Sequence, residues 1–338
     1  MILVTGGTGL VGSHLLLDLM KSGEKVRAIH RKNSDLESVK KVFSHEHSAE
    51  EANRLFTKIE WVVADLTDIP SLEKAFTGIK KVYHCAALVS FDPSAYQQLR
   101  KANIEGTANI VNLCIKNNIE KLCYVSSIAT FDKKLGENVI SETSFWNKEE
   151  NHNIYAITKY GAEIEVWRAS QEGVPVVIVN PGIIIGPGFW NSGSGEIFSR
   201  INSGLKYHFP KVSGFVGVYD VVKSMRALMS SPIKNEEFIV VSENISFRRI
   251  FELTAKYLDK PAPQRELKPW MVAVGWAGQR FLSLFGKKQQ LTRHSVKDLY
   301  QDSFYSNQKI KEALSFKFEE MDLVIKKTAK IFKEENPA

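Results

Sequence analysis

Short apolar runs alternate with amphipathic stretches through the first half of the chain. The runs lie at residues 2–5, 25–30, 59–64, 81–85, 121–126 and 175–179, and most of the segments between them have the apolar spacing of a helix. This alternation is typical of βαβ units, in which helices cover both faces of a parallel sheet. The pattern therefore predicts an α/β fold with a doubly wound parallel sheet.

The pattern changes after residue 180. Glycine- and serine-rich turns at 186–188 and 191–195 separate individual helices, and residues 237–241 read as one more strand. We therefore expect a large α/β domain over residues 1–180, with 211–245 returning to its sheet. Residues 181–210 and 246–335 should form a smaller, mostly helical lobe.

The second half is also rich in aromatic residues. They either line an apolar pocket or form the core of the smaller lobe, and the sequence leaves both open. The residues concerned are Phe189, Trp190, Tyr207, Phe209, Trp270, Trp276 and Phe281.

Composition excludes several classes of protein. With 338 residues, 43% hydrophobic and 25% charged, the chain has the profile of a globular protein rather than a disordered or fibrous one. The net charge is +7, and part of the excess lies near the end of the chain, at Lys326, Lys327, Lys330 and Lys333. A solvated helix face explains these lysines better than a nucleic-acid-binding arm. We expect no nucleic-acid partner, and a small molecule as substrate for a monomer or homodimer.

The cysteines, the first residues of the chain and the length of its most apolar stretch indicate the cellular compartment. Cys85, Cys114 and Cys123 show no metal-ligand spacing, so we expect reduced thiols and no metal. The chain begins directly with an apolar run, which leaves no room for a signal peptide and favours the cytoplasm. Residues 270–286 are broken by Gln279 and Arg280 and fall short of the roughly 20 residues that span a bilayer, so we expect no stable membrane insertion.

A glycine-rich turn follows the first predicted strand. Gly6, Gly9 and Gly12 lie in the run TGGTGLVG, directly before a helical segment. Glycine at this spacing permits a tight turn, close approach of a pyrophosphate to the backbone and close packing of helix on strand. The helix N-terminus then offers N–H groups to the phosphates. Because the motif lies between a first strand and a first helix, it predicts a dinucleotide site.

The end of the second strand bears on the choice of cofactor. A carboxylate there would accept the ribose hydroxyls of NAD, whereas a cation suits the 2′-phosphate of NADP. His30 is followed by Arg31 and Lys32, with no acid. This favours NADP over NAD, with Arg31 and Lys32 near the phosphate.

A tyrosine and a lysine stand four residues apart in YAITK, at Tyr155 and Lys159. On a helix they share one face. A phenol with a pKa near 10 is a weak base at neutral pH, and a neighbouring ammonium would lower that pKa. The pair is therefore a candidate for acid/base chemistry.

Read together, the motifs resemble the extended short-chain dehydrogenase/reductase superfamily, which includes the NAD-dependent epimerases and dehydratases. The matching runs are TGGTGLVG at 5–12, ADLTD at 64–68, HCAA at 84–87, NIEGT at 103–107, YVSS at 124–127, YAITK at 155–159 and NPGIIIGPG at 180–188. The runs at 26–28, 180–188 and 218–222 look most like the dihydroflavonol-4-reductase and 3β-hydroxysteroid dehydrogenase branch. The resemblance implies a Rossmann-type fold, a substrate-binding C-terminal lobe and an NAD(P)-dependent oxidoreductase acting on a carbonyl or secondary alcohol.

The resemblance also assigns roles to residues. It makes Tyr155 the acid/base, Lys159 the residue that lowers its pKa and holds the nicotinamide ribose, and Ser127 the hydrogen-bond donor to the substrate oxygen. Ser126 is the alternative, but a serine that ends a strand can simply satisfy backbone groups, and the family pattern favours Ser127. The cofactor-binding residues it implies are Gly6, Thr8, Gly9, Leu10, Val11, Gly12, Asp65, Leu66, Ala86, Ala87, Asn103, Pro181, Gly182, Ile183 and Ile184.

Two other functions stay open at this point. Dehydratases of the superfamily usually carry threonine followed by an Asp-Glu pair where this chain has Ser127, Ile128 and Ala129, which argues against dehydration. A sugar-nucleotide epimerase would retain the serine but generally has an acid after the second strand. A non-catalytic sensor or scaffold would often lack Tyr155 or Lys159, and both are present.

Overall fold

A seven-stranded parallel sheet forms the centre of the computed structural model, which describes residues 1–274 and 299–337. The strand order across the sheet is β11 (Glu236–Val240), β7 (Val176–Pro181), β5 (Lys121–Val125), β4 (Lys81–His84), β1 (Ile2–Thr5), β2 (Val26–His30) and β3 (Glu60–Val63). All seven strands that the apolar runs predict are present. The order reverses direction at β1, so the predicted Rossmann-type, doubly wound fold is confirmed.

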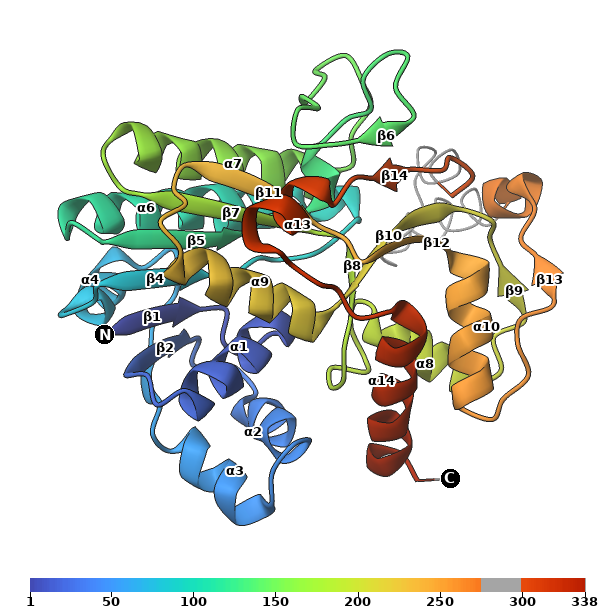
Figure 1. Cartoon of the computed structure of the whole chain (residues 1–338), viewed down its shortest axis with the longest axis horizontal. Helices are drawn as coiled ribbons and strands as arrows, with labels where there is room; N and C mark the ends of the chain where they lie inside the picture. The colour runs from blue at the N-terminus through green and yellow to red at the C-terminus, as the bar shows by residue number, and fades with distance from the viewer. Residues whose placement is uncertain (275–298, 338) are drawn as a thin grey trace.

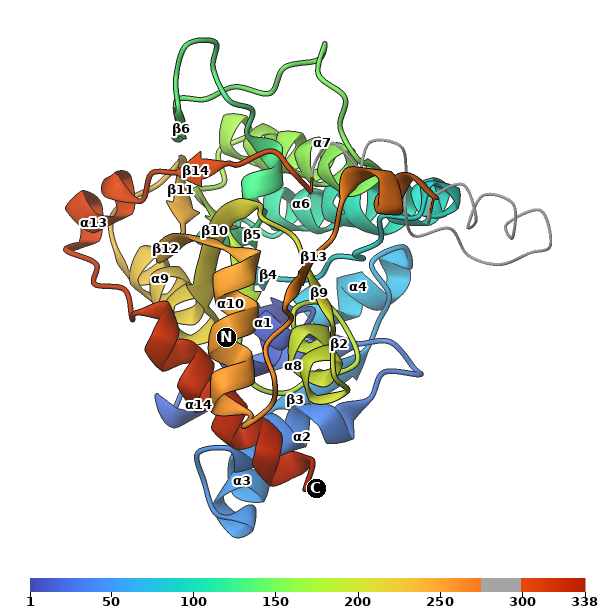
Figure 2. The same cartoon turned by 90° about the vertical axis from the view of Figure 1, so that its right-hand side faces the viewer.

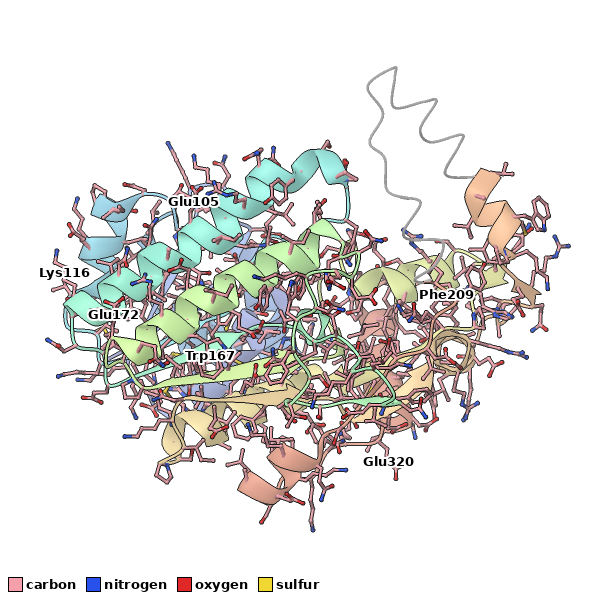
Figure 3. The ribbon with its side chains drawn as sticks, turned by 90° about the horizontal axis from the view of Figure 1, so that it is seen from above. Glu105, Lys116, Trp167, Glu172, Phe209 and Glu320 are labelled. Carbon is pink, nitrogen blue, oxygen red and sulfur yellow. The ribbon has the colours of Figure 1, made fainter. Side chains whose placement is uncertain are left out.

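Helices cover both faces of this sheet (Figure 1). Leu3 of β1 faces a layer formed by α4 (Ile69–Phe76), α6 (Gly106–Lys116) and α7 (Ile154–Gln171). Ile2 and Val4 face the opposite layer, with α1 (Leu10–Lys21) and α9 (Val218–Ser230). The alternation follows from the strand period of two. Figure 3 looks down on the first layer, where α6 and α7 lie side by side.

The charged segment between β2 and β3 is helical. It forms α2 (Leu36–Ser44) and α3 (Ala49–Phe56), whose Val39 and Phe43 are buried against α1. Between β4 and α6 the chain forms η1 (Pro93–Ala95), α5 (Tyr96–Leu99) and the π-helix η2 (Arg100–Glu105). After β5 come η3 (Ile128–Thr130) and the short strand β6 (Val139–Ile140).

A smaller lobe lies beyond the carboxyl ends of the strands (Figure 2). Its three-stranded sheet contains β8 (Ile183–Ile185), β10 (Val212–Gly217) and β12 (Glu243–Ser246), covered by α8 (Gly195–Asn202), α10 (Phe247–Tyr257) and α14 (Met321–Glu335). Two short strand pairs are also present, β9 (Tyr207–His208) with β13 (Arg265–Glu266) and β14 (Phe304–Tyr305) with β6, together with the helix α13 (Gln308–Leu314). Phe198, Phe215 and Phe332 are among the buried residues of its core.

The expected return of residues 211–245 to the large sheet is correct only for β11, which pairs with β7. β10 and β12 belong to the small sheet instead. The reason is local: β8 follows β7 directly, and β10 pairs with β8 rather than with a strand of the large sheet. Gly182 marks this transition, because a Cβ there would lie 2.4 Å from the backbone oxygen of Gly214.

Several aromatic residues of the second half belong to the core of the lobe. The ring centroids of Trp190 and Phe332 are 5.0 Å apart, and those of Phe209 and Phe247 are 4.4 Å apart. Trp270 is instead 66% exposed. Trp276, Phe281 and most of the apolar stretch 270–286 lie outside the described residues. Among the helices that are described, none combines the length and apolarity needed to cross a membrane.

We predict that Gly182→Ala destabilises the protein by at least about 2 kcal/mol, because a backbone oxygen cannot move aside as a side chain can. Gly78→Ala is the matched control, since it has φ +74° but nothing within 4 Å of the added Cβ. That control should lose only about 1 kcal/mol, from the left-handed backbone alone. Urea unfolding measures both, and equal losses would contradict the close contact at Gly182.

Candidate active site

The turn after β1 is held tightly between two neighbours. Gly6 has φ +70°, and a Cβ there would lie 2.5 Å from the backbone nitrogen of Ala86. At Gly12 a Cβ would lie 2.1 Å from the oxygen of Gly6. Packing therefore requires glycine at both positions, and it brings the start of α1 to the carboxyl edge of the sheet. Thr8 lies in the same turn, and Leu10 and Val11 are the first residues of α1.

Gly9 differs from its two neighbours in the motif. It is exposed, and the nearest atom to an added Cβ is the Gly6 oxygen at 3.6 Å, an ordinary contact. Gly9 is also the N-cap of α1, and no side chain caps the helix there. The first N–H groups of α1 thus lie at an end with positive partial charge that suits a phosphate.

The ends of β2 and β3 place a cation beside an acid. His30 pairs with Val63, and the next residues on each strand lead to Arg31 and Asp65. Arg31 and Lys32 are exposed. Asp65 accepts hydrogen bonds from the backbone nitrogen and hydroxyl of Thr67, at 2.9 and 2.7 Å. These bonds, with a smaller contribution from Arg31, hold the pKa of the Asp65 carboxyl below its usual range.

The remaining predicted cofactor residues frame the same edge. Leu66 packs on the start of α6, where a Cβ at Gly106 would lie 2.8 Å from its own Cβ. Ala86 is partly buried and Ala87 is exposed, directly after β4. The residues at the β7–β8 junction are Pro181, which is buried, and Gly182, Ile183 and Ile184, which are partly exposed.

Asn103 lies in the π-helix η2 and is buried. Its side-chain oxygen accepts from the Leu88 nitrogen at 2.7 Å, and its amide donates to the Leu88 oxygen at 2.9 Å and to Thr158 Oγ1 at 3.1 Å. Asn103 thus joins the loop after β4 to α7. Its hydrogen-bonding groups are engaged with protein, so its observed contribution is to position this loop.

The two serines after β5 point to different partners. Ser126 is buried, and its hydroxyl donates to Glu163 at 2.5 Å. Ser127 is partly exposed, accepts from the Ala129 nitrogen at 3.2 Å, and hydrogen-bonds to the phenol of Tyr155. The structure therefore brings Ser127, and not Ser126, to the tyrosine.

Lys159 lies one helical turn after Tyr155 and is buried. Its ammonium donates to the Tyr124 hydroxyl at 2.9 Å and to the Val125 carbonyl at 2.6 Å. Burial lowers the pKa of Lys159 to about 7, although the nearby Glu163 opposes that shift. An ammonium has three donors, so one direction remains after these two bonds.

The pKa of Tyr155 differs from the sequence-based expectation. Burial raises it above its ordinary value, and the Ser127 hydrogen bond only partly opposes the effect. The physical reason is that the Lys159 ammonium is directed at Tyr124 and Val125, while apolar surroundings disfavour the phenolate. The phenol therefore keeps its proton at neutral pH.

Sequence reasoning assigned no role to the polar groups beneath this pair. The His84 ring accepts or donates at 2.6 Å to Thr5 Oγ1 and at 2.9 Å to Thr107 Oγ1, and it stacks on the Tyr124 ring. Burial lowers the pKa of His84 to about 3, so the ring is neutral. All these residues lie within or beside the motifs of the sequence. Side chains of a strand alternate between its two faces, and this alternation is the sequence signal that these residues face the same layer.

A cavity of about 700 Å³ lies elsewhere, between α14 and the loop after β8. His45, Tyr219 and Lys327 are among its lining residues. None of the residues that line it is Ser127, Tyr155 or Lys159. The residues with acid/base potential therefore lie at the sheet edge, away from this cavity.

Comparison with known proteins identifies the family. Residues 4–212, more than half of the chain, match the family model described as "Male sterility protein", an NAD-binding family. A putative dihydroflavonol 4-reductase of Synechocystis is 28% identical over 329 residues, covering 92% of this chain and 88% of the relative. Cinnamoyl-CoA reductase 1 of Petunia hybrida is 25% identical, covering 88% and 91%.

Solved structures agree with this result. The crystal structure of gox2253 is 25% identical, with a TM-score of 0.81 over 99% of this chain and 98% of that one. UDP-glucose 4-epimerase of Thermotoga maritima has a TM-score of 0.75 over 99% of both chains, but at 18% identity it shows the fold alone. The chain belongs to the extended short-chain dehydrogenase/reductase superfamily and is an oxidoreductase that uses NAD or NADP.

Proposed function

We propose that the protein reduces a carbonyl compound to an alcohol, with Tyr155 as the acid, Ser127 as a donor to the substrate oxygen and Lys159 as the residue that holds the nicotinamide ribose. The observation that carries this proposal is the placement of Ser127 beside Tyr155 at the carboxyl edge of the sheet, with a buried ammonium one helical turn after the tyrosine. The names of the reductase relatives support the same class of reaction.

The bound cofactor supplies hydride chemistry at the substrate carbon. The chain supplies the proton and the charge stabilisation. Tyr155 gives its proton to the carbonyl oxygen as negative charge develops there. Ser127 donates a hydrogen bond to the same oxygen, an interaction often worth about 3 kcal/mol in a water-excluded site.

The state of the phenol suits the proton transfer of a reduction. Because burial keeps Tyr155 protonated at neutral pH, it is ready to act as an acid. Oxidation of an alcohol would need the phenolate, which burial disfavours.

The residues at the sheet edge fit a dinucleotide. Packing within the protein does not require glycine at position 9, so the space beside its backbone is open to a ligand. The uncapped N-terminus of α1 suits the pyrophosphate. Asp65 and Leu66 would contact the adenine, and Ala86 and Ala87 would line the groove. The third N–H of the Lys159 ammonium would donate to a ribose hydroxyl.

We further propose a preference for NADP, held by Arg31 and Lys32 at the exposed end of β2. Asp65 is the nearby acid, but its carboxylate is engaged by Thr67. Asp65 also lies after β3, whereas the acid that binds the ribose in NAD enzymes lies at the end of β2. The cations remain to meet a 2′-phosphate.

Substrate selection is proposed to lie with the second lobe and the loop after β4. Phe91 of that loop is 51% exposed, and its ring centroid is 5.8 Å from that of Tyr155. An exposed aromatic beside the acid offers an apolar wall for a carbonyl substrate. Under this proposal residues 1–180 with β11 bind the cofactor, together with Pro181, Gly182, Ile183 and Ile184 at the junction, and the lobe of 181–210 and 246–335 otherwise binds the substrate.

We predict that Tyr155→Phe lowers turnover by at least about 100-fold, because it removes the proton that the reaction needs. Cofactor affinity should change less than about twofold, since Lys159 holds the ribose. Tyr160→Phe on the same helix is the control and should stay active, because the Tyr160 ring stacks on Trp146 instead. A panel of ketones and aldehydes assayed with each cofactor provides the measurement. Substantial activity in Tyr155→Phe would remove this residue from the mechanism.

The NADP preference makes a separate prediction. Arg31→Ala should weaken NADPH binding by about 10- to 100-fold while sparing NADH, since a charge-assisted hydrogen bond is worth about 1.5 to 3 kcal/mol. Lys58→Ala is the control, because this exposed cation precedes β3 and so lies at the amino ends of the strands, opposite the carboxyl edge. Isothermal titration of both cofactors measures the effect. Tighter binding of NADH than NADPH by the unmodified protein would overturn the preference.

The glycine turn gives a third prediction. Gly9→Ala should fold with nearly unchanged stability, because its Cβ makes only an ordinary contact, yet should bind cofactor at least about tenfold more weakly. Gly12→Ala should instead lose stability, since its Cβ would collide with a backbone oxygen. Thermal unfolding and fluorescence titration with NADPH separate the two effects. Unchanged NADPH affinity in Gly9→Ala would show that no ligand approaches this residue closely.

A further inference from the structure

Behind Lys159 lies a buried carboxylic acid that the proposed reaction does not use. Glu163 follows Lys159 by one turn of α7 and is 5% exposed. Its Oε2 accepts from Ser126 Oγ at 2.5 Å and from Asn180 Nδ2 at 3.1 Å. Burial raises the pKa of the Glu163 carboxyl, and these two donors oppose that shift by stabilising its charged form.

A second acid reaches the same place from the edge of the sheet. Glu237 of β11, paired with Ile178 of β7, hydrogen-bonds to Glu163. Its Oε2 is buried and has no hydrogen-bond partner within the described part of the chain. Burial and the neighbouring Glu163 charge raise the pKa of Glu237 to about 8. Two carboxyl groups in direct contact hold one proton between them, because both cannot be ionised side by side.

The surroundings decide which acid carries the proton. Glu163 has two donors, whereas Glu237 has an unpartnered oxygen, so the proton belongs on Glu237 and the charge on Glu163. The other titratable or charged groups near Lys159 and the acid pair include Tyr124, Cys85, His84, Glu142 and Lys309. Among these, Tyr124 and Cys85 stay protonated and therefore neutral, because burial raises the pKa of the phenol and of the thiol. Lys309 is tied to Glu236 at 2.5 Å.

We propose that Glu163 and Glu237 form an acid pair with one shared proton, and that the single negative charge left on Glu163 keeps the buried ammonium of Lys159 protonated. Glu163 is thus a positioning residue that acts through Lys159. The proposal rests on the proposed function, because the charged lysine matters for activity only if it holds the cofactor. The reason for the pair is energetic. A buried ammonium tends to lose its proton, and one nearby anion opposes that loss.

The test titrates Lys159 directly, without cofactor or substrate. Protein with isotopically labelled lysine is followed by NMR over a range of pH, and Lys159→Met identifies the Lys159 resonance by its absence. Glu163→Gln should lower the midpoint of Lys159 by about one unit or more. Glu237→Gln should leave it within a few tenths of a unit, because the amide still donates to Glu163 and the charge stays in place.

Ser126→Ala serves as a second variant in case Glu163→Gln does not fold. It removes one donor from the Glu163 carboxylate and should lower the Lys159 midpoint by a smaller amount in the same direction. An unchanged midpoint in both Glu163→Gln and Ser126→Ala, or equal shifts in Glu163→Gln and Glu237→Gln, would overturn the acid pair.

NADPH affinity measured over the same pH range separates this inference from the proposed function. In the unmodified protein it should fall as pH rises through the Lys159 midpoint, and in Glu163→Gln that fall should begin at lower pH. If Lys159→Met binds NADPH as tightly as the unmodified protein at every pH, the ribose-binding role of Lys159 fails. The acid pair would still be judged by the NMR titration alone.

Discussion

The burial of the Lys159 ammonium is the interaction on which the site depends. Its hydrogen bonds to Tyr124 and to the Val125 carbonyl join α7 to β5, a strand near the middle of the sheet. A buried ammonium is costly unless such partners satisfy it, so the helix cannot rotate or slide without a large loss of free energy. Tyr155, one turn earlier, is therefore held at the carboxyl edge beside Ser127.

The glycine turn fixes the other half of the site by a different principle. Backbone atoms of the β1 turn, α1 and the loop after β4 approach so closely that side chains at Gly6 and Gly12 have no room. Dense packing thus sets the position of the helix N-terminus, and the space beside Gly9 is what remains for a ligand. One short motif serves both the stability of the fold and the proposed binding of phosphate.

Charge is distributed unequally between the two ends of the site. Arg31 lies in solvent, where salt screens its field, so its contribution to NADPH binding should depend on ionic strength. Lys159 and Glu163 lie in the interior, where screening is weak and burial governs the protonation state. The exposed end is suited to discriminating between cofactors. At the buried end the charge close to the reacting atoms depends on the protonation state of Lys159 and therefore on pH.

The sequence by itself determined the strands of the large sheet, the glycine turn and the Tyr155–Lys159 spacing. Strands buried on both faces read as apolar runs, and residues four apart on a helix share a face, so these features depend only on neighbours along the chain. The position of Glu163, four residues after Lys159, was readable on the same grounds. Its importance was not, because nothing local shows that the position is buried.

Only the tertiary structure decided the features that join distant segments. Pairing of β10 with β8 directed residues 212–217 to the small sheet, and the periodicity of a single strand cannot specify its partner. The meeting of Glu237 with Glu163 depends on β11 lying beside β7. The raised pKa of Tyr155 likewise follows from burial, which is a property of the assembled fold. Strand order and desolvation arise from contacts between residues far apart in sequence, so local sequence patterns do not specify them.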